Sequence, residues 1–116
     1  MHKIRVIGVV GACGTGKSEL VNRLKNLGYQ AIHIAQEHSF APKMWMQLTN
    51  PDFLVFLEVS YPETMKRKKF NWTEKEFSQQ LFRLRHAKAN ADLVIDTDHI
   101  SPDEVFEVVL SELNSL

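Results

Sequence analysis

The sequence predicts a single α/β domain, arranged as a three-layer sandwich around a short parallel sheet of about four strands. Two observations predict this fold. Short apolar, β-branched segments alternate along the chain with segments whose apolar residues recur at helical spacing. A length of 116 residues is enough for one hydrophobic core but not for two. Since no repeat, low-complexity stretch or linker divides the chain, we expect one domain over residues 1–116.

Four segments have the composition of buried strands. Each is short, apolar and bounded by residues that favour turns or helix starts. These segments are residues 4–10, 29–35, 52–59 and 91–96. The third is expected to lie in the centre of the sheet. Because helical segments separate the strands, the sheet should be parallel with right-handed crossovers.

The first two helices are predicted from apolar spacing and stop signals. A helix should begin near Lys17 and end at Gly28, a residue typical of the position just after a helix. Its buried face is expected to consist of Leu20, Leu24 and Leu27. A second, short helix within residues 41–48 should stop before Asn50-Pro51.

Three later helices are predicted from capping boxes of the form Ser/Thr-x-x-Glu. The boxes are Ser60-Tyr61-Pro62-Glu63, Thr73-Glu74-Lys75-Glu76 and Ser101-Pro102-Asp103-Glu104. Apolar residues at helical spacing follow the second and third boxes. They are Phe77, Leu81 and Leu84 in one helix and Val105, Val108, Val109 and Leu113 in the other.

A glycine-rich motif between the first strand and the first helix indicates a phosphate site. The run Gly11-Ala12-Cys13-Gly14-Thr15-Gly16-Lys17-Ser18 matches the pattern G-x-x-x-x-G-K-S/T at every fixed position. Glycines let the backbone N–H groups curl around phosphate oxygens, and the following helix start adds a positive dipole end. Lys17 would reach the β and γ phosphates of a nucleoside triphosphate, and the Ser18 hydroxyl would bind Mg²⁺. Cys13 is interpreted as a small residue at a variable position rather than as a redox group.

Three segments together resemble P-loop kinases of the group that includes shikimate, gluconate and nucleotide kinases. The first is the strand and loop just described. The second is the strand 53–60 with the basic run Lys66-Arg67-Lys68-Lys69, which resembles the strand entering the mobile lid of those kinases. The third is the strand 91–96 with the loop and helix after it, which resemble the adenine side. The resemblance implies ATP and Mg²⁺ as cofactors and a small-molecule substrate.

The resemblance also implies roles for individual residues. The lid-like segment, about residues 60–73, places Arg67 as the first candidate to close over the transferred phosphoryl group, followed by Arg83 and Arg85. A solvated basic surface is the alternative for these side chains. Glu19 and Asp98, at the end of the motif and in the adenine-side loop, complete the expected nucleotide site.

One part of the family pattern is missing. Such kinases usually have a further strand and helix that carry the Walker B acid and much of the acceptor pocket, whereas residues 38–50 are too few for both. The acceptor site is therefore reduced or supplied by another chain. Glu37, at the end of the second strand, is the best candidate to hold Mg²⁺ or to take the acceptor proton. Glu58 and Asp96 are the alternatives, although Asp96 is expected rather to order the loop after it.

Composition limits the other classes of function. The net charge is zero, which argues against a dedicated nucleic-acid binder, and no apolar run approaches the length of a membrane span. The single cysteine excludes an intrachain disulfide and fits a cytoplasmic protein. The five histidines show no tight pair such as H-x-x-x-H on a helix and have no thiolate partner, so we expect no metal site from them. Trp45 and Trp72 are interpreted as packing residues.

Two hypotheses remain. The first is a small-molecule kinase that uses Mg·ATP. The second is a nucleotide-binding regulatory ATPase module without its own acceptor site. A GTPase is disfavoured because the chain has neither an N/T-K-x-D motif nor a D-x-x-G switch. Since a four-stranded sheet leaves exposed edges, a homodimer is also expected.

Overall fold

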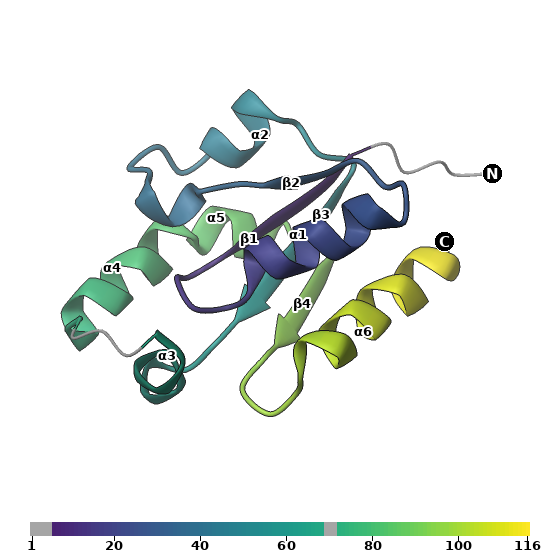
Figure 1. The fold of residues 1–116 in the computed structure, drawn as a ribbon. Helices are drawn as coiled ribbons and strands as arrows, with labels where there is room; N and C mark the ends of the chain where they lie inside the picture. The colour runs from purple at the N-terminus through teal and green to yellow at the C-terminus, as the bar shows by residue number, and fades with distance from the viewer. Residues whose placement is uncertain (1–5, 69–71) are drawn as a thin grey trace.

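A computed structural model describes residues 6–68 and 72–116 as an α/β fold. Its four-stranded sheet is parallel throughout, in the order β2-β1-β3-β4 (Figure 1). The strands are β1 Ile7–Gly11, β2 Ala31–His33, β3 Phe53–Glu58 and β4 Leu93–Asp96. All four predicted strands are confirmed, and each is shorter than its apolar segment. Ile4 and Arg5, expected in the first strand, lie outside the described residues, as does Lys69 of the basic run.

Helices fill the connections between the strands. They are α1 Lys17–Asn26, the 3-10 helix η1 Gln36–His38, α2 Met44–Leu48, α3 Tyr61–Lys68, α4 Glu74–Arg83, α5 Arg85–Ala89 and α6 Pro102–Asn114. Gly28 follows the end of α1 with a φ of 94°, a left-handed conformation that suits glycine, so the predicted stop is confirmed. Among the described residues, no helix combines the length and the apolar character that crossing a membrane would require.

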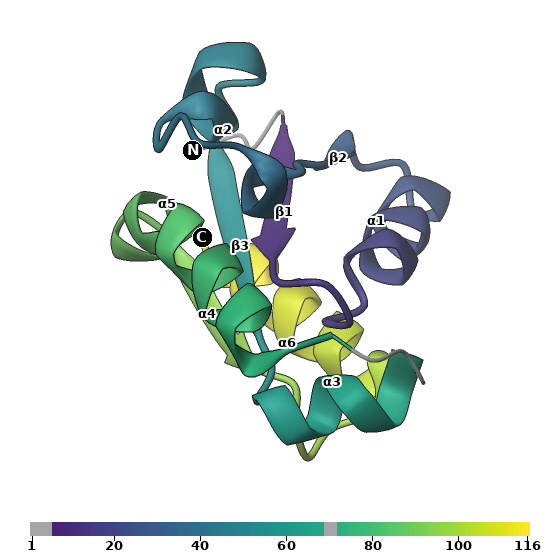
Figure 2. The same ribbon diagram turned by 90° about the vertical axis from the view of Figure 1, so that its left-hand side faces the viewer.

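Apolar side chains cover both faces of the sheet. On one face Val9, Val55 and Ile95 pack against α1 and α6, and on the other Val10, Leu54 and Phe56 pack with α4 and α5. Adjacent strand residues therefore point to opposite cores, as the period of a strand requires. Figure 2 shows the sheet between these helices. Helices on both faces are compatible with the predicted three-layer arrangement, and β3 is central, as predicted.

The two tryptophans are packing residues, as expected. Trp45 and Trp72 belong to the core that α4 and α5 cover. The indole N–H of Trp45 donates to His86 Nδ1 at 3.1 Å, and that of Trp72 donates to Thr64 Oγ1 at 3.0 Å. Both rings are thereby fixed inside the protein.

The predicted buried faces of three helices are correct only in part. The exceptions are Leu27, Leu81 and Val108, which are 57%, 44% and 41% exposed. Leu27 lies beyond α1, at its C-cap. In α4 the buried polar residue Gln80 takes the place expected of Leu81, because its amide bonds to Cys13: the N–H of Cys13 donates to Gln80 Oε1 at 3.0 Å. Gln80 is thus a structural partner of the loop 11–18.

The capping boxes are also confirmed in part. Those at Thr73 and Ser101 form with both hydrogen bonds. At Ser60 the hydroxyl accepts from the N–H of Glu63 at 3.4 Å, but the N–H of Ser60 donates to Asp98 Oδ1 at 2.8 Å. The backbone N–H of Ser60 is therefore tied to the loop after β4 instead of to the side chain of Glu63.

Chain topology determines where a site can form. In the strand order β2-β1-β3-β4, the connection after β1 leads to β2 on one side, and the connection after β3 leads to β4 on the other side. The two connections therefore diverge at the carboxyl ends of the adjacent strands β1 and β3. In open parallel sheets this point is where ligands bind. The loop 11–18, η1, the start of α3 and the loop after β4 all follow strand ends at this edge. Figures 1 and 2 show α3 lying beyond the arrowheads of the strands.

Candidate functional site

The loop 11–18 leads from the carboxyl end of β1 into α1. Gly11 must be glycine because a Cβ there would lie 2.5 Å from the carbonyl oxygen of Leu57 in the neighbouring strand. Gly16 is the N-cap of α1 and has a φ of 89°, in the left-handed region. The loop therefore needs its glycines for close approach to β3 and for the turn into the helix.

The N-terminus of α1 differs from those of α4 and α6. Thr73 and Ser101 cap the latter two through their side chains, whereas no side chain hydrogen bond caps α1. The first N–H groups of a helix have no partner within the helix and carry its positive dipole end. The start of α1 is therefore available to bind an anion.

Lys17 lies buried behind this helix start. Its side chain is 6% exposed, and Nζ donates to the carbonyls of Gly11 at 2.7 Å and Ala12 at 3.1 Å. Nζ also forms an ion pair with Glu37 Oε2 at 2.9 Å. All three protons of the ammonium group have partners. To contact Lys17, an anion bound at the loop would have to replace one or more of these partners.

Glu37 lies after the carboxyl end of β2, as predicted, and there it pairs with Lys17, a contact that was not predicted from the sequence. It is in η1, and its side chain is 3% exposed, so the alternative of a solvated loop acid is wrong. Its second carboxylate oxygen, Oε1, is buried without a hydrogen-bond partner. The alternatives have other partners: Glu58 pairs with Lys88, and Asp96 Oδ1 accepts from the N–H of Asp98 at 3.0 Å. Asp96 thus orders the loop after β4, as expected.

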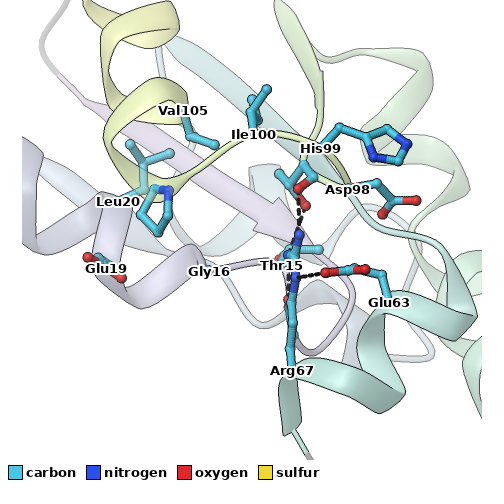
Figure 3. A pocket seen from close by; sticks show the side chains of 13 residues that line it. Thr15, Gly16, Glu19, Leu20, Glu63, Arg67, Asp98, His99, Ile100 and Val105 are labelled. Carbon is cyan, nitrogen blue, oxygen red and sulfur yellow. Dashed lines mark hydrogen bonds and ion pairs between the residues drawn. The ribbon is translucent and has the colours of Figure 1, made fainter.

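Arg67 reaches from α3 across to two loops. Its Nη1 donates to the carbonyl of Gly14 and to Thr97 Oγ1, each at 3.0 Å, and Nη2 donates to the carbonyl of Thr97. Nε donates to Glu63 at 3.2 Å (Figure 3). Arg67 therefore joins the lid-like segment to the loop 11–18, although its side chain remains 26% exposed. Lys66, next to it, is exposed.

Arg83 and Arg85 lie apart from this contact. Arg83 donates to the carbonyl of Glu37 at 3.3 Å and covers the ring of Phe40. Arg85 donates to the carbonyl of Phe82 at 2.8 Å and covers its ring. Arg83 therefore borders the neighbourhood of Glu37, whereas Arg85, at the start of α5, bonds back to the last turn of α4.

A cavity of about 630 Å³ lies between the loop 11–18, α3 and the start of α6 (Figure 3). Its lining comprises Gly14, Thr15, Gly16, Glu19, Leu20, Glu63, Arg67, Thr97, Asp98, His99, Ile100, Pro102 and Val105. The predicted nucleotide-site residues divide between two places. Six of them line this cavity: Gly14, Thr15, Gly16, Glu19, Arg67 and Asp98. Five others, Gly11, Ala12, Cys13, Lys17 and Ser18, belong to the same loop but do not line it.

Two residues of the site were missed from the sequence. Thr97, 2% exposed, accepts from Arg67 and donates to the carbonyl of Glu58 at 2.7 Å. Its position directly after a predicted strand was a usable signal, because ligands gather at such ends. Gln80, the second of these residues, accepts from the N–H of Cys13. The signal for it was a polar residue on the side of α4 that is buried. His33 also neighbours the site: burial and then the charge of Lys17 lower its pKa.

The expectation that the histidines have no cysteine partner is wrong. Cys13 Sγ lies 3.8 Å from His38 Nε2, although 25 residues separate them in sequence. Sequence spacing could not show this contact, because it depends on β1 and β2 being adjacent.

The comparisons with known proteins identify no family. No protein-family model matches the chain, and no curated protein matches it.

Proposed function

We propose that the chain binds Mg·ATP at the loop 11–18 and transfers its γ-phosphoryl group to a hydroxyl or phosphate of a small molecule. One observation carries the proposal: a loop that fits the nucleotide-binding pattern at every fixed position leads into a helix whose start no side chain caps. The free N–H groups and helix dipole favour a polyphosphate there. On this proposal the α/β fold is a small P-loop NTPase.

The cavity beside the loop has room for the nucleoside. Its apolar lining from Leu20, Ile100 and Val105 suits a base, while its polar lining from Glu19 and Asp98 suits a ribose or an exocyclic amine. The phosphates would extend from the cavity over Gly14, Thr15 and Gly16 toward Lys17.

Lys17 and Glu37 would do the central chemistry. On binding, Nζ of Lys17 would exchange the carbonyls of Gly11 and Ala12 for phosphate oxygens, keeping its charge compensated. The buried carboxylate of Glu37 then stands beside the phosphoryl end, with Oε1 free to accept the proton of an acceptor hydroxyl. The Ser18 hydroxyl, exposed in the first turn of α1, would hold Mg²⁺. The ion, when bound, neutralises phosphate charge.

Arg67 would act on the transferred group. Its guanidinium already touches the loop at Gly14. A small rotation away from Thr97 would bring it to the phosphates, where a planar guanidinium suits the oxygens of a phosphoryl group in transfer.

The second candidate, a regulatory ATPase module, is favoured by the short connection between η1 and β3. Only α2, of five residues, stands where related kinases have a strand and a helix for the acceptor. The two candidates differ in whether a second substrate accelerates ATP consumption.

An ATP-consumption screen separates them. Nucleosides, sugar acids, shikimate-like alcohols and phosphorylated metabolites are each added to the chain with Mg·ATP, and ADP formation is compared with the rate in water alone. The kinase proposal predicts that one class raises the rate well above hydrolysis. It also predicts that Glu37→Gln lowers that rate by a factor on the order of 10²–10⁴, as for loss of a general base. Rates equal to hydrolysis for every class, despite ATP binding, would favour the module.

A further inference from the structure

A second cluster of chemically active side chains borders the loop 11–18. Cys13, Glu37 and His38 each offer one ligand atom, and these atoms lie within 4.8 Å of one another. Two of the separations are short: 3.8 Å from Cys13 Sγ to His38 Nε2, and 3.7 Å from His38 Nε2 to Glu37 Oε2. Thiol, imidazole and carboxylate from two connections thus converge on one point.

The carboxylate of Glu37 is the observation that points to a ligand. Its Oε1 is buried and has no hydrogen-bond partner, while Oε2 bonds to Lys17. Leaving a buried carboxylate oxygen unpaired costs free energy comparable to a lost hydrogen bond or more. A cation bound beside Glu37 would remove that cost.

The geometry suits zinc. With Zn–S near 2.3 Å and Zn–N and Zn–O near 2.0–2.2 Å, the ligand atoms of a tetrahedral site lie about 3.4–3.6 Å apart. The separations from His38 Nε2 to Cys13 Sγ and to Glu37 Oε2 exceed this by a few tenths of an ångström, and the ligand atoms of Cys13 and Glu37, within 4.8 Å of each other, would move closer when an ion binds. The donor set selects the metal class, because thiolate and imidazole prefer Zn²⁺ and its neighbours to Mg²⁺ or Ca²⁺.

Neighbouring groups support such a site. Gln80 Nε2 lies 3.3 Å from Cys13 Sγ, where it can donate a hydrogen bond to a thiolate. Lys17 pairs with Glu37 Oε2, the oxygen that lies 3.7 Å from His38 Nε2, which leaves Oε1 of the same carboxylate for a cation. Outer-shell hydrogen bonds of this kind orient metal ligands. The His38 side chain is 60% exposed, so an ion can enter from solvent.

We infer that Cys13, Glu37 and His38 form a site for a zinc-class divalent cation, with a fourth position open to water or to a ligand. This site is separate from the Mg²⁺ proposed at Ser18 and does not require kinase activity, but it shares Glu37 with the proposed function, so a bound cation would occupy the carboxylate assigned there to the acceptor proton. Since Cys13 belongs to the loop 11–18 and Glu37 pairs with Lys17, the site borders the loop on the side of β2.

Cobalt titration of the reduced, nucleotide-free protein tests the inference. Co²⁺ replaces Zn²⁺ in tetrahedral sites and reports thiolate ligation by a charge-transfer band in the near ultraviolet. We expect that band to grow to one equivalent and to disappear when Zn²⁺ is added. Cys13→Ser should abolish it. His38→Ala and Glu37→Gln should each weaken Co²⁺ binding by a factor of at least about 10, since even outer-shell changes cost that much.

The matched control is His99→Ala, which removes an exposed histidine on the loop after β4 and should leave cobalt binding unchanged. Circular dichroism confirms folding of each variant, and Cys13→Ser and His38→Ala change side chains that are not fully buried. Absence of the band in the wild type, or its persistence in Cys13→Ser, would overturn the site. A band that depends on Cys13 but not on His38 or Glu37 would also overturn it, as a simple thiol adduct. ATP binding is measured separately, so failure here leaves the proposed function standing.

Discussion

At the scale of single residues, the pair of Lys17 and Glu37 dominates the candidate site. Both side chains are nearly excluded from solvent, and they lie 2.9 Å apart. A buried ion pair is costly to break from one side, because the remaining charge is left without compensation. Loss of either side chain should therefore lower the stability of the fold. An anion that binds at the loop 11–18 has to compete with Glu37 for the charge of Lys17.

This pair gives a prediction for stability. Lys17→Met should lower the free energy of unfolding by about 3–5 kcal/mol, because it leaves the Glu37 carboxylate buried and unpaired. Adding Glu37→Gln to that variant should restore part of the loss. Urea unfolding of the two single variants and the double variant measures the coupling. If the double variant is no more stable than Lys17→Met alone, the ion pair does not contribute as the structure indicates.

Asp98 gives a prediction for acid stability. Burial raises its pKa, but hydrogen bonds from the backbone and side chain of Ser60, together with the charges of His99 and Arg67, lower it below the ordinary value of 3.8. A lowered folded-state pKa contributes stability that is present above the unfolded pKa and is lost as pH falls through the folded one. The destabilisation caused by Asp98→Asn should therefore be larger at pH 6 than at pH 3.

The control for Asp98 is Glu107→Gln, on the exposed side of α6. Its effect on unfolding should not change between these two pH values. An effect of Asp98→Asn that is equally large at both would contradict the assignment of the Ser60 hydrogen bond as the link between β4 and α3.

At the scale of elements, α3 connects the two halves of the site. Arg67 spans from this helix to Gly14 and Thr97, and the N–H of Ser60, just before the helix, donates to Asp98. These contacts hold α3 beside the loop 11–18. In the proposed function the same contacts would rearrange when phosphate arrives.

The role of α3 is tested through Arg67. In a kinase, Arg67→Ala should leave ADP binding nearly unchanged but lower turnover with the acceptor by a factor on the order of 10³, because a guanidinium that stabilises the transition state is lost. Lys66→Ala, at the exposed neighbouring position, is the control and should change neither. Turnover of Arg67→Ala within about twofold of the wild type would refute a role in phosphoryl transfer.

The elements themselves followed from the sequence to differing degrees. The alternation of apolar strands and capped helices predicted β1 to β4 and the starts of α4 and α6, because these signals are local. The inward position of Gln80 was not predicted, because its contact with Cys13 decides it. The incomplete capping box at Ser60 was not predicted either, because the N–H of Ser60 donates to Asp98. In the site, Lys17 was predicted from the loop motif and Glu37 from its place after a strand, but their ion pair was not predicted. The approach of Cys13 to His38 required the order of the strands.

At the scale of the whole molecule, β2 and β4 form the two edges of the sheet among the described residues. β2 has three residues and β4 has four, and both lie at the edges. An edge strand presents unpaired backbone groups to which a second copy can bind. We therefore expect a homodimer in sedimentation experiments at high micromolar concentration, and a monomer both with and without ATP would refute this.

The central claim is that the loop 11–18 binds ATP through Lys17. Its most direct test is the rise in melting temperature with Mg·ATP in the Glu37→Gln background, where no buried carboxylate is left uncompensated when Lys17 is changed. At a hundredfold excess over Kd, binding adds about 2.7 kcal/mol of stability, which a small domain shows clearly. We predict that Glu37→Gln and Glu37→Gln/Lys25→Met, which changes an exposed lysine of the same helix, keep this rise. Glu37→Gln/Lys17→Met should lose most of it, and an equal rise in that variant would contradict the claim.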